Sequence, residues 1–290
     1  MAYRKGIVDI GSNTVQLLLA EHGDEKWHIV DQQVRTTRLG QGLKEGILTE
    51  TSMEATVQAC LEYRQILTRA QAGPPLAVGT SAMRDAANAW VLQQRIAARC
   101  GWPVRILSGA EEAAASYQGA LCDFPPEADL PVVDIGGGST EIIYRQGGSL
   151  QAVSAGLGAR RAQSCGWLQP QIREIIGRRF AAIKSLPDTA VGVGGTFTTA
   201  AGLLLGLSRY ARRAVQGYIL DAPQTAELLR RLSPLTATQR CAYSPLLAQR
   251  GEIILQGLWI VQGIFQRFAF KNIIVSAGGL SDGLLLQTTA

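Results

Sequence analysis

The sequence predicts a mixed α/β fold with two similar lobes. A glycine-rich loop occurs twice, at residues 7–15 and at residues 132–141. Each copy has an apolar run, an aspartate, a tight glycine turn, hydroxyl side chains and a second apolar run. Strand-like and helix-like segments also alternate along the chain, which is typical of sheets covered by helices. The length of 290 residues favours two domains over a single core.

In the first half, apolar–polar alternation predicts strands, and apolar residues at helical spacing predict helices. The expected strands are 5–20, 27–38, 76–80 and 104–107, and the expected helices are 51–70, 85–100 and one that begins near residue 108. Thr49 or Ser52 can cap the helix at 51–70, which ends at Gly73 and the two prolines that follow.

Three prolines in the nine residues 123–131 predict a linker, so we place the domains at 1–124 and 125–290. The second half then repeats the order of elements. Its expected strands are 132–135, 142–144, 150–153, 190–193 and 272–275, and its expected helices are 157–166, 170–184, one after Thr196, 246–268 and the C-terminal end. The repeated opening indicates an internal duplication at the scale of a domain.

Composition predicts a soluble, cytoplasmic protein that does not enter a membrane. Apolar residues make up 47% of the chain and charged residues 18%, and no stretch of about 18 apolar residues could form a membrane-spanning helix. The N-terminal residues lead directly into a strand and leave no room for a signal peptide.

The cysteines and histidines exclude several kinds of site. The five cysteines are scattered without CxxC spacing, and we expect them to be buried, reduced thiols: Cys60, Cys100, Cys122, Cys165 and Cys241. His22 and His28 are the only histidines, which argues against a histidine-based zinc site and against a Ser-His-Asp triad.

The net charge of +5 and four arginine pairs predict either a basic surface for a polyanion or solvated helix faces. These pairs are Arg160-Arg161, Arg178-Arg179, Arg212-Arg213 and Arg230-Arg231. No aromatic stacking pattern accompanies them, so we do not expect single-stranded nucleic acid as a partner.

The paired glycine loops predict a phosphate site. Successive backbone N–H groups in a glycine turn form an anion-binding nest, and adjacent hydroxyls add donors. An ordinary hairpin explains one such loop, but two loops in the same order favour a ligand. The expected phosphate-binding residues are Gly11, Ser12, Asn13 and Thr14 in the first loop, and Gly136, Gly137, Gly138, Ser139 and Thr140 in the second.

Asp9 and Asp134 end the strands that precede these loops. Carboxylates placed there suit a hard cation such as Mg²⁺, which also bridges to phosphate. The alternative is that each aspartate only accepts hydrogen bonds from its own turn.

Two further glycine clusters follow apolar strands and precede helices. The first contains Gly194, Gly195 and Thr196, and the second contains Gly278 and Gly279. The start of a helix after such a turn favours a bound anion, and close strand–helix packing is the alternative.

Glu111 and Glu112 open a predicted helix, and Arg84 directly follows a predicted strand. Either glutamate is a candidate general base, because no histidine is at hand. Pairing with the start of the helix is the competing explanation. Arg84 could clamp a phosphate bidentately or pair with a nearby carboxylate.

The chain resembles, over nearly its whole length, the exopolyphosphatase and guanosine pentaphosphate phosphohydrolase family. The resemblance is carried by the segments 9–14, 38–43, 80–88, 107–113, 134–141 and 192–196. The most specific part is Ser139-Thr140-Glu141 after three glycines, together with the paired glutamates upstream. The family belongs to the actin, sugar-kinase and Hsp70 superfamily. It therefore implies two duplicated actin-like (ribonuclease H-like, ASKHA) domains with a cleft between them.

The resemblance also implies roles for single residues. It places the catalytic base at Glu112 and a phosphate-clamping arginine at Arg84, and it places metal and phosphate binding at Asp134, Gly136, Ser139 and Glu141. We therefore expect Mg²⁺ or another divalent cation near Asp134, with Asp9 or Glu141. The chain departs from the family in two ways. It lacks the helical C-terminal half of the long members, and it has no arginine near Ser281 in its last glycine motif.

The resemblance implies hydrolysis of a terminal phosphoanhydride bond. The expected substrate is inorganic polyphosphate or guanosine pentaphosphate. The arginine pairs favour polyphosphate, the longer polyanion. A superfamily phosphotransferase with an aspartate base is an alternative, and so is a non-catalytic sensor of polyphosphate or alarmone. Related proteins are often dimers, so a homodimer is expected.

Overall fold

The computed structural model describes residues 3–23, 26–41, 43, 46–125 and 128–288. Gly42 of the motif at 38–43 and two linker positions, Pro126 and Glu127, lie outside the described residues. The chain divides into two compact units. The first runs to Gly119 and includes the segment from Leu280 onward, and the second is Ala120–Gly279. The segment from Leu280 was expected in the second domain; it lies in the first unit because its leucines are buried there.

The first unit contains a five-stranded sheet in the order β3-β2-β1-β4-β5. Its strands are β1 (Tyr3–Ile10), β2 (Thr14–Gly23), β3 (Lys26–Thr36), β4 (Leu76–Gly79) and β5 (Val104–Ile106). β1, β2 and β3 are antiparallel neighbours, whereas β4 and β5 run parallel to β1. Its helices are α1 (Glu50–Arg69), α2 (Ser81–Asp85), α3 (Ala89–Cys100), α4 (Gly109–Ala120) and α12 (Leu280–Leu286).

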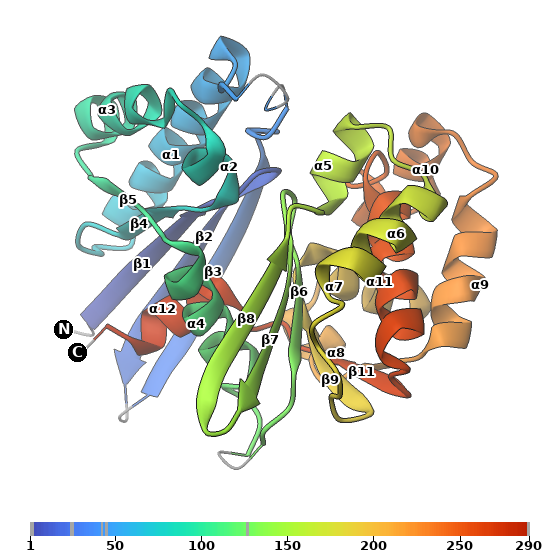
Figure 1. Cartoon of the computed structure of the whole chain (residues 1–290). Coiled ribbons are helices and arrows are strands. Elements are labelled where there is room, and N and C mark those ends of the chain that lie inside the picture. Colours follow the sequence, from blue (N-terminus) through green and yellow to red (C-terminus); the bar gives the residue numbers. More distant parts are fainter. Residues whose placement is uncertain (1–2, 24–25, 42, 44–45, 126–127, 289–290) are drawn as a thin grey trace. The chain divides into compact units, whose positions relative to one another are not determined.

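Helices cover both faces of this sheet, so β1 is apolar on both sides (Figure 1). Val8 and Ile10 pack with residues of α1 and α3. Ile7 packs on the other face with Ala115 of α4 and Leu284 of α12. Side chains alternate along a strand, and Asp9 therefore shares the face that α4 and α12 cover.

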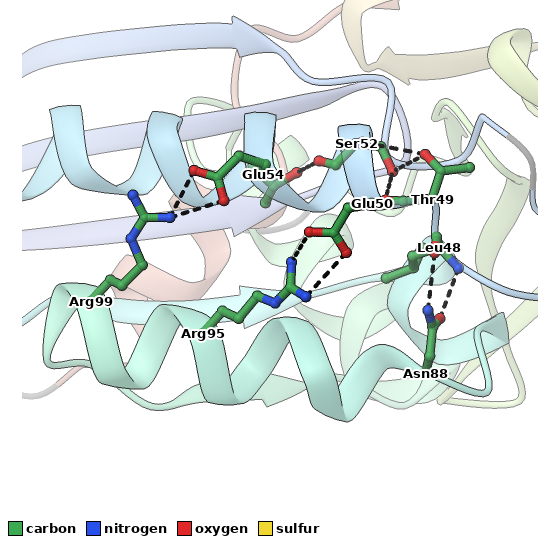
Figure 2. A network of polar contacts seen from close by, with 9 residues as sticks. Leu48, Thr49, Glu50, Ser52, Glu54, Asn88, Arg95 and Arg99 are labelled. Carbon is green, nitrogen blue, oxygen red and sulfur yellow. Dashed lines mark hydrogen bonds and ion pairs between the residues drawn. The ribbon is translucent and has the colours of Figure 1, made fainter.

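Polar contacts tie α1 to α3 (Figure 2). Thr49 caps α1, and its hydroxyl oxygen accepts a hydrogen bond from the Ser52 N–H. Asn88, just before α3, both donates to and accepts from the backbone of Leu48. Along the helices, Arg95 pairs with Glu50 and Arg99 with Glu54. These contacts hold the two helices side by side over the first face of the sheet.

The second unit contains a six-stranded sheet in the order β10-β11-β9-β6-β7-β8. Its strands are β6 (Val132–Ile135), β7 (Thr140–Gln146), β8 (Ser149–Ala155), β9 (Thr189–Val193), β10 (Ile219–Leu220) and β11 (Asn272–Val275). Its helices are α5 (Ala159–Ser164), α6 (Gln169–Arg179), α7 (Gly195–Leu204), α8 (Arg212–Val215), α9 (Ala222–Leu232), α10 (Ala237–Tyr243) and α11 (Ile254–Phe268). A single large core joins α6, α7, α9 and α11 to the sheet.

The two sheets share one topology. In each, three antiparallel strands are followed by strands parallel to the first: β1-β2-β3 then β4 and β5, and β6-β7-β8 then β9 and β11. Only β10 has no counterpart among the described strands of the first unit. The internal duplication predicted from the sequence is therefore present in the strand order.

Several element boundaries differ from the sequence expectations. The helix expected at 85–100 begins only at Ala89, as α3, and a short helix that was not expected, α2, ends at Asp85, just before Ala86, which has an extended backbone. The helix expected at 246–268 begins only at Ile254, after a short 3₁₀ turn. α9 and α10 were missed, although Asp221 with Gln224 and Thr236 with Gln239 form capping boxes, which are readable in a sequence.

The five cysteines are free thiols, as expected. Burial holds only for part of them: Cys60 and Cys100 are buried, Cys165 and Cys241 are half-buried, and Cys122 is exposed. The expectation of burial is wrong for Cys122, because this residue follows the end of α4 at the start of the linker.

Candidate active site

The first glycine loop is a tight turn between β1 and β2. The Gly11 N–H donates to the Thr14 carbonyl at 3.0 Å. Behind the turn, the Ser12 and Asn13 carbonyls accept from backbone N–H groups of the segment 37–40, at 2.7 to 3.1 Å. Two of the loop's carbonyl oxygens, which would repel an anion, are thus committed to the protein's own backbone.

The second loop repeats this arrangement between β6 and β7. The Gly136 N–H donates to the Ser139 carbonyl at 3.0 Å. The carbonyls of Gly136 and Gly137 accept from the N–H groups of Ala159 and Arg161 at the start of α5. Each loop therefore closes with the same turn hydrogen bond and is braced by the segment that follows the third strand of its sheet. Phosphate binding by the loops stays a prediction.

The two aspartates have different partners across their hairpins. Asp9 is paired in register with Gln16, whereas Asp134 is paired with Glu141. Directly opposed residues of an antiparallel pair project from the same face, so the second unit presents two carboxylates together. Glu141 is 8% exposed and accepts a hydrogen bond from the Ser154 hydroxyl at 2.7 Å.

This carboxylate pair has the donor chemistry that suits Mg²⁺. Among the described residues, no cluster of three or more His, Cys, Asp or Glu could hold a metal ion. Mg²⁺ in phosphoryl-transfer sites needs only one or two carboxylates, because water and substrate phosphates complete its coordination. Asp134 and Glu141 meet that requirement within one unit.

The third glycine cluster lies beside this pair. Gly194 ends the turn from β9 into α7 with a φ of +97°. Residues other than glycine rarely adopt this backbone conformation. A Cβ at this position would lie 2.5 Å from the Ile135 carbonyl oxygen and 3.5 Å from Oδ1 of Asp134. Of the expected site residues Gly194, Gly195 and Thr196, Gly194 thus lies directly beside the strand end that leads into the second loop, and close packing there also requires a glycine. Gly195 instead meets Arg250, and Thr196 packs against Gly257 of α11.

Sequence reasoning missed Arg250. Its guanidinium lies against Gly195, in the space that a Cβ of residue 195 would fill. Burial lowers the pKa of Arg250, and the electrostatic interaction with Tyr210 opposes this shift. A cation beside the first turn of α7 reinforces the preference of that turn for an anion. The available signal was a charged group, Arg250-Gly251-Glu252, near the start of the mainly apolar segment 246–268.

The structure distinguishes the two glutamates of α4. Glu111 is exposed, and its carboxylate accepts from the Ser108 N–H and hydroxyl at 2.8 Å each. These bonds lower the pKa of Glu111. Glu111 therefore serves the helix start, which was the competing explanation for the pair.

The Glu112 side chain, unlike that of Glu111, is largely buried. It is 16% exposed and accepts from Nη1 of Arg84 at 2.7 Å. Burial raises the pKa of Glu112, an effect that Arg84 opposes and the nearby Asp85 reinforces. A buried carboxylate of raised pKa is a better proton acceptor than an exposed one.

Arg84 is committed to protein partners in this state. The same Nη1 that binds Glu112 also donates to the Leu107 carbonyl at 3.0 Å. Of the two sequence alternatives for Arg84, the structure contains the carboxylate pair, and a phosphate contact stays a prediction.

A model of the Ppx/GppA phosphatase family matches residues 18–290. The chain belongs to this family. Exopolyphosphatase 2 of Mycobacterium tuberculosis is 29% identical, over 98% of each chain. A guanosine-5'-triphosphate,3'-diphosphate pyrophosphatase of Vibrio campbellii is 25% identical over 97% of this chain, but the match spans only 58% of that longer protein.

Solved family structures share the fold. A Ppx/GppA protein of Aquifex aeolicus superposes with a TM-score of 0.80 at 28% identity, over 99% of this chain and 97% of the other. An exopolyphosphatase from Cytophaga hutchinsonii, at 23% identity, has a TM-score of 0.87 over 98% and 96% of the chains. The predicted class, two duplicated actin-like α/β domains, is confirmed. No helix in the described part of the chain is both long and apolar enough to span a membrane.

Proposed function

We propose that this protein is an exopolyphosphatase, which releases orthophosphate from the end of inorganic polyphosphate. The observation that carries the proposal is Glu112, a largely buried carboxylate of raised pKa held by Arg84. The full-length match to an exopolyphosphatase supports this substrate.

In the proposed reaction, Glu112 accepts a proton from water as the water oxygen attacks the terminal phosphorus. The anhydride P–O bond breaks, and the shortened chain leaves with the bridging oxygen. The products are orthophosphate and a polyphosphate one unit shorter. Phosphoryl transfer has a loose transition state, so positioning and charge neutralisation supply most of the rate.

The loops at Gly11–Thr14 and Gly136–Thr140 would hold phosphate oxygens through N–H and hydroxyl donors. Asp134 and Glu141 would hold Mg²⁺, with Asp9 as a further candidate. The bound cation would neutralise charge on the phosphates. In this proposal the base would lie in the first unit and the metal-binding carboxylates in the second.

Guanosine pentaphosphate is the second candidate substrate, because relatives named for this substrate match nearly all of the chain. The deciding experiment measures orthophosphate release from long-chain polyphosphate and from guanosine pentaphosphate, with Mg²⁺ and with excess EDTA. We expect a higher kcat/KM on polyphosphate and no turnover in EDTA. A higher kcat/KM on the nucleotide would reverse the choice, and tight binding without turnover would favour a sensor.

A further inference from the structure

The Ser81 hydroxyl has a contact that the proposed reaction leaves unused. Ser81 is the first residue of α2, and its Oγ lies 3.0 Å from Oγ of Ser12 in the first glycine loop. Both residues are 5% exposed. Two nearly buried hydroxyls thus share one hydrogen bond, in which either oxygen can be the donor.

A hydroxyl has one hydrogen to donate and two lone pairs to accept with. If Ser12 donates to Ser81, its hydrogen is used within the protein. If Ser81 donates to Ser12, the Ser12 hydrogen is available for another acceptor. A phosphate oxygen over the loop is an acceptor only, so binding it requires the second arrangement.

α2 is a firm platform for this hydrogen bond. Met83 is 1% exposed and fills the space beside Gly79, so a Cβ on Gly79 would overlap its sulfur. The next residue, Arg84, is bound to the Leu107 carbonyl and to Glu112. Just before Ser81, the Thr80 N–H donates to the Ile10 carbonyl at 3.2 Å. Ser81 therefore lies between backbone and side-chain contacts that hold the helix in place. The second loop has Gly137 at the position of Ser12 and has no comparable hydroxyl.

We propose that Ser81 is a positioning residue, which donates to Ser12 and so directs the Ser12 hydroxyl hydrogen toward a bound phosphate. The inference rests on the proposed function for its ligand. It adds that one donor of the first loop is oriented by α2, the same helix that carries the partner of Glu112.

A double-mutant cycle with Ser12→Ala, Ser81→Ala and the double variant tests this role, by kcat/KM for polyphosphate. We expect Ser81→Ala to lower kcat/KM about 3- to 10-fold, the factor of a neutral hydrogen bond. In the Ser12→Ala background the same change should have less than about a twofold effect. Ser81→Thr, which keeps the hydroxyl, should restore most of the activity.

Ser116→Ala is the matched control, because Ser116 is buried in the same unit and its hydroxyl has no hydrogen-bond partner among the described residues. It should leave kcat/KM unchanged. Equal losses from Ser81→Ala in both backgrounds, or no loss in either, would overturn the role. If the wild type releases no phosphate from polyphosphate, the proposed function fails, and calorimetric binding of inorganic phosphate to the same variants still tests Ser81.

Discussion

The hairpin that opens the first unit and the hairpin that opens the second close with the same hydrogen bond, yet they carry different side chains. The first loop has Ser12 and Asn13 where the second has two glycines, and Asp9 faces Gln16 where Asp134 faces Glu141. The duplicated backbone thus provides two equivalent turns, and the two turns differ in the side chains that they carry. The paired carboxylates are in the second unit and the base candidate in the first.

The supports of the two loops differ as well. Gly40 stands behind the first loop, where a Cβ would lie 3.2 Å from Ser12. Gly158 stands behind the second loop, where a Cβ would overlap the backbone of Gly137 and Gly138. The second loop is therefore packed more tightly against its support. We attribute this to the absence of side chains at residues 137 and 138.

The largest effect is expected at the base. Glu112→Gln keeps the shape of the side chain but removes its ability to accept a proton, and kcat on polyphosphate should fall roughly 10²–10⁴-fold. Binding of polyphosphate, measured by calorimetry, should persist. Glu111→Gln is the control on the same helix turn, and its kcat should stay near that of the wild type. Near-normal turnover by Glu112→Gln would show that Glu112 is not the general base.

Arg84→Gln should have the next largest effect. Loss of a hydrogen bond to a charged group predicts a fall in kcat of roughly 10- to 100-fold at neutral pH. Arg84 opposes the rise in the pKa of Glu112, so its removal raises that pKa further. The base must be ionised to act, and the acid limb of the pH–kcat profile therefore moves to higher pH.

The pH profile separates the two roles considered for Arg84. A pure phosphate clamp would raise KM and leave the acid limb where it was. Arg105→Gln removes an exposed partner of Glu111 and is the matched control, with no expected shift of the profile.

The sequence was sufficient for the duplicated hairpins, because strand alternation and glycine turns are local signals. It could not separate Glu111 from Glu112 on chemistry alone. One step along a helix turns a side chain by about 100°, and only the packing of α4 decides which of two neighbours meets solvent. The family resemblance favoured Glu112, the residue that the structure shows largely buried.

Two other features depend on contacts between distant parts of the chain. Arg250 lies beside Gly195 although the two residues are 55 positions apart in sequence. α12 returns to the first unit, where Gly283 approaches Ala115 so closely that a Cβ would overlap its carbonyl. Neither pairing has a local pattern, so sequence periodicity could not place them.

Glu141→Gln tests the division of labour directly, because it gives the second hairpin the Asp–Gln pair of the first. If Asp134 and Glu141 hold Mg²⁺, the Mg²⁺ concentration that gives half-maximal activity should be higher for Glu141→Gln than for the wild type. Ser154→Ala removes only the hydroxyl that holds Glu141. Loss of such an outer partner costs about 10- to 100-fold in metal affinity, so Ser154→Ala marks the low end of the range and Glu141→Gln should exceed it.

Asp9→Asn in the first unit completes this comparison. If Asp9→Asn raises the Mg²⁺ requirement less than Glu141→Gln does, the main metal ligands are those of the second unit. An equal or larger rise would assign Asp9 an equal share, and an unchanged requirement in both would contradict the metal assignment.

Alanine substitutions at Gly158 and Gly40, the glycines behind the two loops, should lower the free energy of unfolding by different amounts. Gly158→Ala forces the backbone of the second loop to move, and overpacking of this kind costs about 1–3 kcal/mol in the free energy of unfolding. Gly40→Ala meets Ser12 only at 3.2 Å and should cost less. Chemical denaturation followed by circular dichroism measures both. Gly177→Ala, within α6 and without a neighbour inside 4 Å, is the control and should be neutral or stabilising.

The smallest effect is expected where α1 and α3 are tied together. Arg99 and Glu54 pair at 2.7 Å with side chains 43% and 52% exposed, and such pairs contribute about 0.2–1 kcal/mol. Arg99→Ala should therefore change the free energy of unfolding by less than about 1 kcal/mol, and less still at high salt. The kcat should not change, because this pair lies on the α1/α3 face of the sheet and Glu112 is on α4, over the other face. A large loss of kcat would show that the two faces of the first sheet are coupled.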